Sequence, residues 1–252
     1  MINIAVVNQS TVVKDADASA WTDALQTQVS QDFFPVWGVD AKLTFLPNGK
    51  NAPAGAWVLA ILDNADQANA LGYHDITPDG LPLGKVFAKT TLDDGGAVSV
   101  TASHELLEML GDPDINLTAE LDDGSGTPSK FYAYEVCDAC EDDRFGYKIN
   151  NVLVSDFVYP AYFESFRKAN STQFDHGKKI TAPFTLLAGG YISVLDLANL
   201  TEGWQQLTAN RSDLAAQFKS RARIGSRRER RRISRSHWIV SRYQNKSATA
   251  SL

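Results

Sequence analysis

The hydrophobic pattern of the first part of the chain predicts alternating strands and helices. Residues 2–7 are apolar and β-branched, which favours a buried strand, and residues 41–46 alternate in polarity as a strand does. Between them, apolar residues at four-residue spacing predict a helix that packs on a sheet; they are Trp21, Leu25, Val29 and Phe33. We expect Ser19 to cap this helix, and Pro35 and Gly38 to end it.

The following elements include a clearly bounded helix. The continuous apolar run 56–62 is typical of a central strand that is covered on both faces. Residues 84–90 predict a strand exposed along one edge of the sheet. A helix is expected over 97–110, because Gly111 can adopt the left-handed C-terminal conformation and Pro113 prevents continuation.

The second half of the chain is less regular. Residues 112–160 are loop-rich and acidic, with short strand candidates at 131–136, 147–149 and 152–158. Residues 161–218 have a weaker pattern of helix and loop. The order of elements predicts an α/β fold of the α+β type, with a mixed sheet and a loop-rich C-terminal subdomain.

Composition excludes several classes of protein. The 252 residues are 44% hydrophobic and 21% charged, unlike a coiled-coil rod or a largely disordered chain. Two cysteines are too few for a disulfide scaffold. No apolar run approaches the roughly 20 residues of a membrane-spanning helix, and the N-terminus lacks the features of a signal peptide. We therefore expect a cytoplasmic protein without a membrane partner.

Residues 104–108, His-Glu-Leu-Leu-Glu, carry the clearest candidate chemistry. Residues four apart share a helix face, so His104 and Glu108 can both point at one metal ion while Glu105 stands beside it. The neighbouring leucines indicate a largely buried helix, where such a cluster is costly unless it is paired or coordinated. The spacing therefore predicts a metal site.

The ligand types bear on which metal binds. The Glu108 carboxylate is a competent Zn²⁺ ligand, but it cancels one unit of the ion's charge and makes Mn²⁺ more plausible than two histidines would. A second acidic segment at 134–143 crowds like charges that a cation would offset. We expect Zn²⁺, with Mn²⁺ as the alternative.

The element order up to residue 114 and the H-E-x-x-E pattern resemble the zincin metallopeptidases. Zincin-like sequences of this type also carry Asp-Pro just after the helix, similar to Asp112-Pro113, and a later Glu-x-x-Asp segment, similar to residues 135–138. The resemblance implies that the helix supplies two metal ligands and a general base.

By this resemblance, His104 and Glu108 are the helix ligands and Glu105 is the general base of a peptidase. The cation would polarise the scissile carbonyl and acidify a water, while Glu105 takes that proton and delivers it to the leaving amine. The peptide substrate would lie along the edge strand 84–90, adding its backbone hydrogen bonds to the sheet. An oxyanion donor is also needed, and the candidates are Tyr134, Tyr147, Tyr159 and Tyr162.

The third ligand has more than one candidate. Zincins with a distant carboxylate ligand suggest Glu135 or Asp138. The metzincin subgroup instead aligns Gly111 with its turn and Asp114 with its third ligand. We favour Glu135 and Asp138, because Gly111 and the residues after it are already explained as a helix stop.

Several other residues have weaker claims. Cys137 and Cys140 form a single C-x-x-C without the second pair of a zinc ribbon, so we interpret them as two thiols near the acidic cluster. Asp156 is either a group that holds a metal ligand or a turn residue. Single histidines are expected to have surface or core roles; they are His74, His176 and His237.

Charge separates the C-terminus from the rest. Residues 219–252 carry +10 and residues 1–218 carry −16, for a net charge of −6. We expect a zincin-like subdomain over 1–114, a subdomain over 115–218 that completes the metal site, and a basic tail. The alternative to a peptidase is a catalytically silent zincin-like scaffold whose tail, through residues 219–235, binds nucleic acid or an acidic partner.

Overall fold

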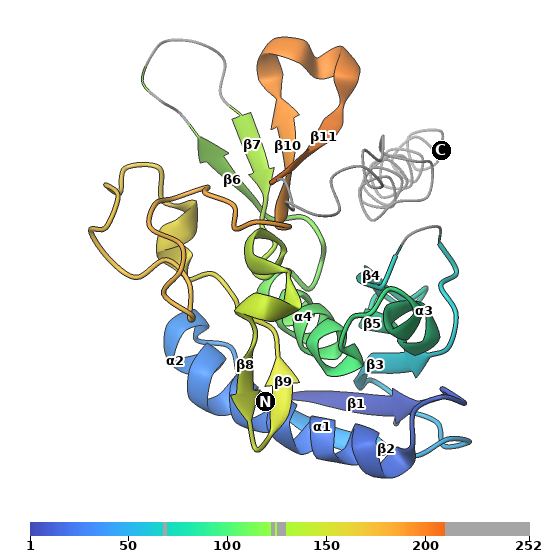
Figure 1. Cartoon of the computed structure of the whole chain (residues 1–252). Coiled ribbons are helices and arrows are strands. Elements are labelled where there is room, and N and C mark those ends of the chain that lie inside the picture. The colour runs from blue at the N-terminus through green and yellow to red at the C-terminus, as the bar shows by residue number, and fades with distance from the viewer. Residues whose placement is uncertain (68–69, 122–123, 125–129, 210–252) are drawn as a thin grey trace, which may run out of the picture.

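The structure is a computed structural model that describes residues 1–67, 70–121, 124 and 130–209. Its N-terminal part contains a five-stranded mixed sheet (Figure 1). Its strands are β1 (Ile2–Asn8), β2 (Ala41–Leu46), β3 (Trp57–Leu62), β4 (Gly72–Ile76) and β5 (Pro82–Phe87). The strand order is β2-β1-β3-β5-β4, in which only the β4–β5 pair is antiparallel. The chain has α+β content, and β3 is central as predicted.

The first helical segment follows the predicted apolar stripe. It consists of α1 (Asp15–Thr27), a π-helical stretch (Gln28–Phe33) and α2 (Phe34–Trp37). Leu25, Val29 and Phe33 are buried, whereas Trp21 is half-buried. The helix begins before Ser19, which therefore does not cap it; Asp15 and Asp17 instead place negative charge in the first turn, where the helix dipole favours it.

The end of this segment agrees with the prediction. Gly38 follows α2 with φ of 70° and donates its N–H to the Phe34 carbonyl. This left-handed conformation is one that glycine adopts without steric cost, which explains why the helix stops there.

The prediction that residues 84–90 form the sheet edge is wrong. Residues 82–87 form β5, which lies between β3 and β4, and residues 88–90 begin α3 (Ala88–Asp93). The edge strand is β4, which pairs with β5 through a tight turn in which Thr77 N–H bonds to Leu81 O at 2.8 Å. The sequence of β4, Gly-Tyr-His-Asp-Ile, has no hydrophobic alternation, so the hydrophobic pattern does not predict this strand.

The helix that carries the H-E-x-x-E pattern is α4 (Val98–Gly111), close to the predicted range. It lies near the centre of the molecule in Figure 1, and its residues 102–110 are all buried. Its start is capped from a distant segment, because Asp143 Oδ2 accepts a hydrogen bond from Ala97 N–H at 2.7 Å. The helix is therefore held in place by tertiary contacts.

Gly111 does not act as the predicted left-handed stop. It is the last residue of α4 and is not among the residues with positive φ. A Cβ at this position would lie 2.9 Å from Val136 Cγ1, so glycine is needed for close packing of the segment that follows β7. The helix ends at Asp112, whose carboxylate accepts hydrogen bonds from Asn116 N–H and Leu117 N–H.

The C-terminal half forms a second sheet of four antiparallel strands, in the order β11-β10-β7-β6. These strands are β6 (Thr118–Leu121), β7 (Lys130–Ala133), β10 (Tyr191–Asp196) and β11 (Trp204–Thr208). Strands β10 and β11 fall in the range where the sequence pattern was weak. A separate hairpin joins β8 (Tyr147–Ile149) to β9 (Val152–Val154) through Asn150 and Asn151, both with positive φ.

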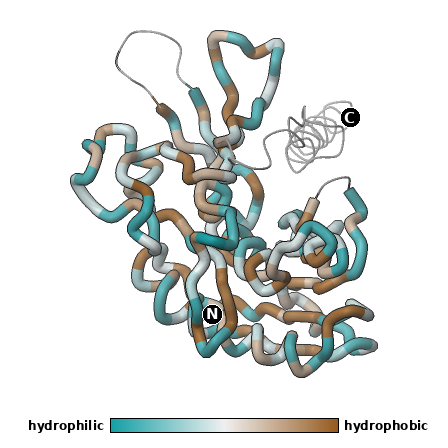
Figure 2. Tube along the Cα trace, viewed as in Figure 1, coloured by the Kyte–Doolittle hydropathy of each residue, from teal (hydrophilic) through white to brown (hydrophobic). Residues whose placement is uncertain are grey.

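One hydrophobic core joins the two halves. It includes apolar residues of β1, α4, β9 and β10, and the tube in Figure 2 is hydrophobic along β1. A buried polar link crosses this core: Ser103 Oγ donates to Gln28 Oε1 at 2.7 Å and accepts from Ser155 N–H at 3.0 Å. Gln28 Nε2 also donates to Ser155 O, so α4, the π-helix and β9 are tied together.

Short 3₁₀ helices complete the described chain; they are Asp138–Cys140, Asp143–Phe145, Pro160–Phe163 and Leu197–Glu202. Within the described residues, no helix has both the length and the apolar character needed to span a membrane. The basic tail and His237 lie outside the described residues, so the tail's predicted partner stays a prediction.

We predict that Gly72→Ala destabilises the fold. The added Cβ would lie 2.7 Å from Glu105 Oε1 and 2.8 Å from the Lys85 carbonyl oxygen, so the strand and α4 must move apart. Overpacking of this kind costs about 1–3 kcal/mol of unfolding free energy, measurable by urea denaturation. The exposed change Lys42→Ala on β2 is the control, with an expected effect below about 0.5 kcal/mol. An unchanged midpoint for Gly72→Ala would contradict the close approach.

Candidate metal centre

Helix α4 presents an imidazole and two carboxylates to the interior of the protein. His104, Glu105 and Glu108 are 4%, 2% and 0% exposed. His104 Nε2 lies 3.1 Å from Glu108 Oε1, one helical turn away, as the four-residue spacing predicted. The two side chains therefore converge inside the protein rather than pointing to solvent.

A second segment supplies carboxylates opposite the helix. Glu135 and Asp138 follow β7, are buried, and pack beside α4 because Val136 contacts Gly111. Asp138 Oδ1 lies 3.2 Å from His104 Nε2. The structure thus brings together all four metal ligands predicted from the sequence.

His74 is a member of the cluster that sequence reasoning missed. It lies on β4, is 3% exposed, and its Nδ1 is 3.4 Å from Glu108 Oε2 and 4.0 Å from Glu105 Oε2. Its Nε2 lies 3.9 Å from Glu135 Oε2. No local motif surrounds His74, and the signal that could have identified it was the strand pairing of β4 with β5.

Five of the six side chains form two groups that share Glu108, and Glu105 belongs to neither group. Donor atoms of His104, Glu108 and Asp138 lie within 4.8 Å of one another, and so do those of His74, Glu108 and Glu135. Each group has one imidazole and two carboxylates, which is a competent donor set for Zn²⁺ or Mn²⁺. Either group can hold a divalent ion.

Two glycines allow α4 to approach the sheet this closely. Gly72 and His74 share a face of β4, and Gly84 of β5 is the register partner of His74. A Cβ on Gly72 would lie 2.7 Å from Glu105 Oε1, and one on Gly84 would lie 3.6 Å from Glu105 Cβ. A side chain at position 72 would therefore push the helix away from β4, whereas the closest atom to a Cβ at position 84 is Leu59 Cδ1, at 2.7 Å.

The carboxylates dominate the electrostatics of the cluster. Burial works to lower the pKa of His104, but the charges of Glu108 and Asp138 outweigh it and hold the pKa well above its usual range. No lysine or arginine in the described part of the chain is buried. The cluster is therefore rich in negative charge, and a cation binding there competes with a proton on His104.

The alternative third ligand is not near the cluster. Asp114 is exposed, whereas both groups of candidate ligands are fully buried. Asp112, two residues earlier, is buried and accepts the backbone hydrogen bonds that end α4. Of the two alternatives that the sequence offers for the third ligand, the structure places segment 135–138, not Asp114, in the candidate groups.

The tyrosines proposed as oxyanion donors lie in separate environments. Tyr147 Oη donates to Asp32 Oδ2 at 2.8 Å, and Tyr159 Oη lies 3.4 Å from His176 Nδ1. Tyr134 stacks on Phe163. Tyr162 is fully buried; burial raises its pKa well above its usual range, and the charge of Asp138 adds to this effect. Of the four tyrosines, Tyr162 is thus the one whose pKa is raised by the charge of a candidate ligand, Asp138.

The cysteine pair is buried and reduced. Burial and the charge of Glu108 raise the pKa of Cys137 well above its usual range, and burial and the charge of Asp156 do the same for Cys140. Both thiols are therefore protonated at neutral pH, and neither belongs to the two groups of candidate ligands.

Asp156 belongs to a second acidic pair outside the metal cluster. Burial and a hydrogen bond with the neighbouring carboxyl of Asp175 raise the pKa of Asp156 to about 8. Asp156 Oδ1 accepts from Phe157 N–H and Gly177 N–H, while Asp175 accepts from Lys179 N–H and Ile180 N–H. The two carboxyls therefore organise the backbone of the surrounding loops.

Comparisons of the chain with protein-family models, with curated proteins and with solved structures find no match. Function is therefore inferred from the chemistry of this chain's own residues, chiefly the cluster on α4.

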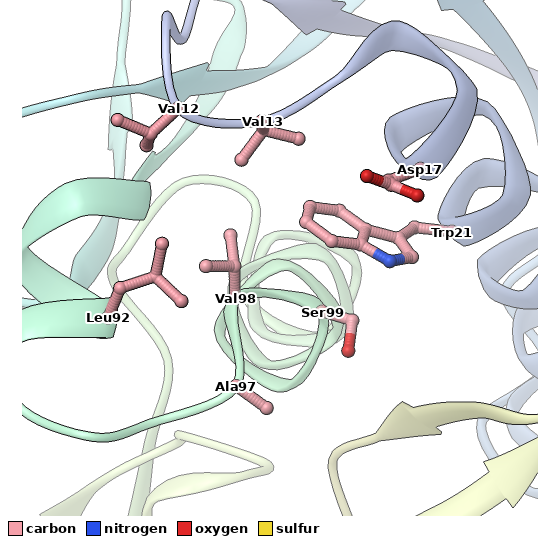
Figure 3. A pocket seen from close by; sticks show the side chains of 8 residues that line it. All are labelled: Val12, Val13, Asp17, Trp21, Leu92, Ala97, Val98 and Ser99. Carbon is pink, nitrogen blue, oxygen red and sulfur yellow. The ribbon is translucent and has the colours of Figure 1, made fainter.

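A pocket of about 310 Å³ lies near the N-terminus of α4, next to α1 (Figure 3). Its lining is mainly apolar, and it consists of Val12, Val13, Asp17, Trp21, Leu92, Ala97, Val98 and Ser99. It contains no member of the metal cluster. We assign the candidate chemistry to the cluster, because the titratable groups converge there.

We predict that Asp156→Asn changes the pH dependence of stability. The folded wild type keeps a proton on Asp156 up to about pH 8, whereas the unfolded chain releases it near the ordinary value of 3.8. The free energy of unfolding therefore falls as pH rises between these values, and the variant lacks this fall. Relative to wild type, Asp156→Asn should gain about 3–4 kcal/mol between pH 5 and pH 8.

Urea denaturation at several pH values measures this difference, with the exposed change Asp114→Asn as the matched control. Parallel curves for wild type and Asp156→Asn would show that the pair does not hold an extra proton.

Proposed function

We propose that the protein is a zincin-like, metal-dependent peptidase. His104, Glu108 and Asp138 would hold a divalent cation, Zn²⁺ or Mn²⁺, and Glu105 would be the general base. The observation that carries the proposal is the position of His104 Nε2, 3.1 Å from Glu108 Oε1 and 3.2 Å from Asp138 Oδ1 inside a buried cluster.

The donor spacing fits a metal ion. With metal–ligand bonds of 2.0–2.2 Å, neighbouring donors of a tetrahedral site lie about 3.3 Å apart. The observed separations of 3.1 and 3.2 Å are close to this value. One imidazole and two carboxylates leave a divalent ion formally neutral, so the ion would remove the cost of burying these charges.

When bound, the cation would act as a Lewis acid on the scissile carbonyl and would acidify a water molecule. Glu105 lies beside the ligands, and its carboxylate would accept the proton of that water and then deliver it to the leaving amine. Because Glu105 is only 2% exposed, few water molecules compete for its hydrogen bonds, which strengthens electrostatic interactions there.

The edge strand next to Glu105 supports a peptide as the substrate. Strand β4 is the last strand in the sheet order, and its Gly72 faces Glu105. An extended peptide that adds to β4 by backbone hydrogen bonds would run past the general base. We therefore propose β4, rather than residues 84–90, as the strand to which the substrate adds.

We predict that Glu105→Gln abolishes peptide hydrolysis but leaves the metal bound. The amide cannot accept the proton, whereas the ligands His104, Glu108 and Asp138 are untouched, so the expected loss is about 10²–10⁴-fold. Hydrolysis of a library of internally quenched peptides gives the rate, and elemental analysis of protein purified without chelators gives the metal content, expected to be at least one Zn²⁺ or Mn²⁺ per chain.

The matched control is Glu120→Gln, an exposed glutamate on β6, which should retain full activity. Protein that binds no metal would refute the proposed site. A metal-loaded protein in which Glu105→Gln hydrolyses peptides at the wild-type rate would refute the role of Glu105.

A further inference from the structure

Glu108 presents its two carboxylate oxygens to two different imidazoles. Oε1 lies 3.1 Å from His104 Nε2 on the same helix, and Oε2 lies 3.4 Å from His74 Nδ1 on the edge strand. Glu108 is fully buried between them. A carboxylate placed in this way can bridge two cations, each bound to one oxygen.

Each imidazole also has its own additional carboxylate. Asp138 Oδ1 lies 3.2 Å from His104 Nε2, and Glu135 Oε2 lies 3.9 Å from His74 Nε2, the other ring nitrogen from the one nearest Glu108. One donor atom from each of His74, Glu108 and Glu135 still lies within 4.8 Å of the others. The two groups of donors therefore share only Glu108. This pattern differs from one ion surrounded by all six side chains, in which the donors would converge on a single point.

The charge of the cluster also favours two ions. When ionised, the four buried carboxylates of Glu105, Glu108, Glu135 and Asp138 carry four negative charges, and no described lysine or arginine is buried with them. One divalent cation beside two neutral imidazoles would leave a net charge of −2 in the interior. Two divalent cations would leave none, which removes a large desolvation cost.

The sheet is shaped to bring the second imidazole to the helix. His74 reaches Glu108 because Gly72 precedes it on the same face and Gly84 is its register partner on β5. A Cβ on Gly72 would meet the Glu105 carboxylate at 2.7 Å.

We propose that the centre is dinuclear: a second divalent cation binds to His74, Glu108 and Glu135, and Glu108 bridges it to the cation of His104 and Asp138. Carboxylate-rich sites with few imidazoles favour Mn²⁺ over softer ions. Paired ions in hydrolases lie about 3.5–4 Å apart and stabilise both the attacking and the leaving group. This inference deepens the proposed function, and it rests on the first metal site proposed there.

The test is the stoichiometry and magnetic coupling of Mn²⁺ in the full-length chain. Native mass spectrometry after gel filtration counts the ions, and electron paramagnetic resonance reports whether they interact. We expect two Mn²⁺ per wild-type chain with an exchange-coupled spectrum. His74→Ala and, separately, Glu135→Gln should each bind one Mn²⁺ and show the six-line spectrum of an isolated ion.

His176→Ala is the matched control, because it removes a histidine that packs on Tyr147 and Phe157 and belongs to neither group of ligands. It should bind two coupled ions. Circular dichroism checks that each variant is folded, and Glu135→Gln provides a second variant if His74→Ala does not fold.

The outcomes separate the two proposals. One Mn²⁺ in the wild type, unchanged in His74→Ala, would overturn the second site and leave the peptidase proposal intact. Two Mn²⁺ without coupling would overturn the bridging role of Glu108. No bound Mn²⁺ or Zn²⁺ in the wild type would overturn both proposals.

Discussion

The burial of four carboxylates around one turn of α4 is the constraint on which the rest of the centre depends. Carboxylates at 0–3% exposure are costly unless each has a compensating charge or hydrogen bond, and two imidazoles alone cannot balance four negative charges. The pKa of His104 is raised because the neighbouring carboxylates stabilise its protonated form. The divalent cation proposed for this centre would balance more of this charge than a proton does.

Close packing makes that convergence possible. Helix α4 approaches the sheet over Gly72 and Gly84, while Gly111 allows the segment with Glu135 and Asp138 to lie against the end of the helix. The polar link between Ser103, Gln28 and Ser155 holds the opposite side of the helix. The ligands are therefore placed by backbone contacts on several sides, so their spacing does not depend on loop conformation alone.

The second acidic pair shows a different way to bury carboxylates. Asp156 and Asp175 both accept backbone hydrogen bonds, and burial raises the pKa of Asp156 to about 8. Within the described residues, neither Asp156 nor Asp175 belongs to a group of candidate metal ligands. The contrast supports a cation at the cluster on α4, where imidazoles accompany the carboxylates, and a proton at the pair.

Much of the fold and part of the centre could be predicted from local sequence pattern. Periodicity is a local property, so it identified β1, β3 and α4, and the four-residue spacing placed His104 and Glu108 on one face. It did not identify β4 as the edge, nor His74 as a neighbour of Glu108. Those depend on which strands pair and on how closely a helix packs over glycines, and contacts between residues distant in the chain leave no periodic signal.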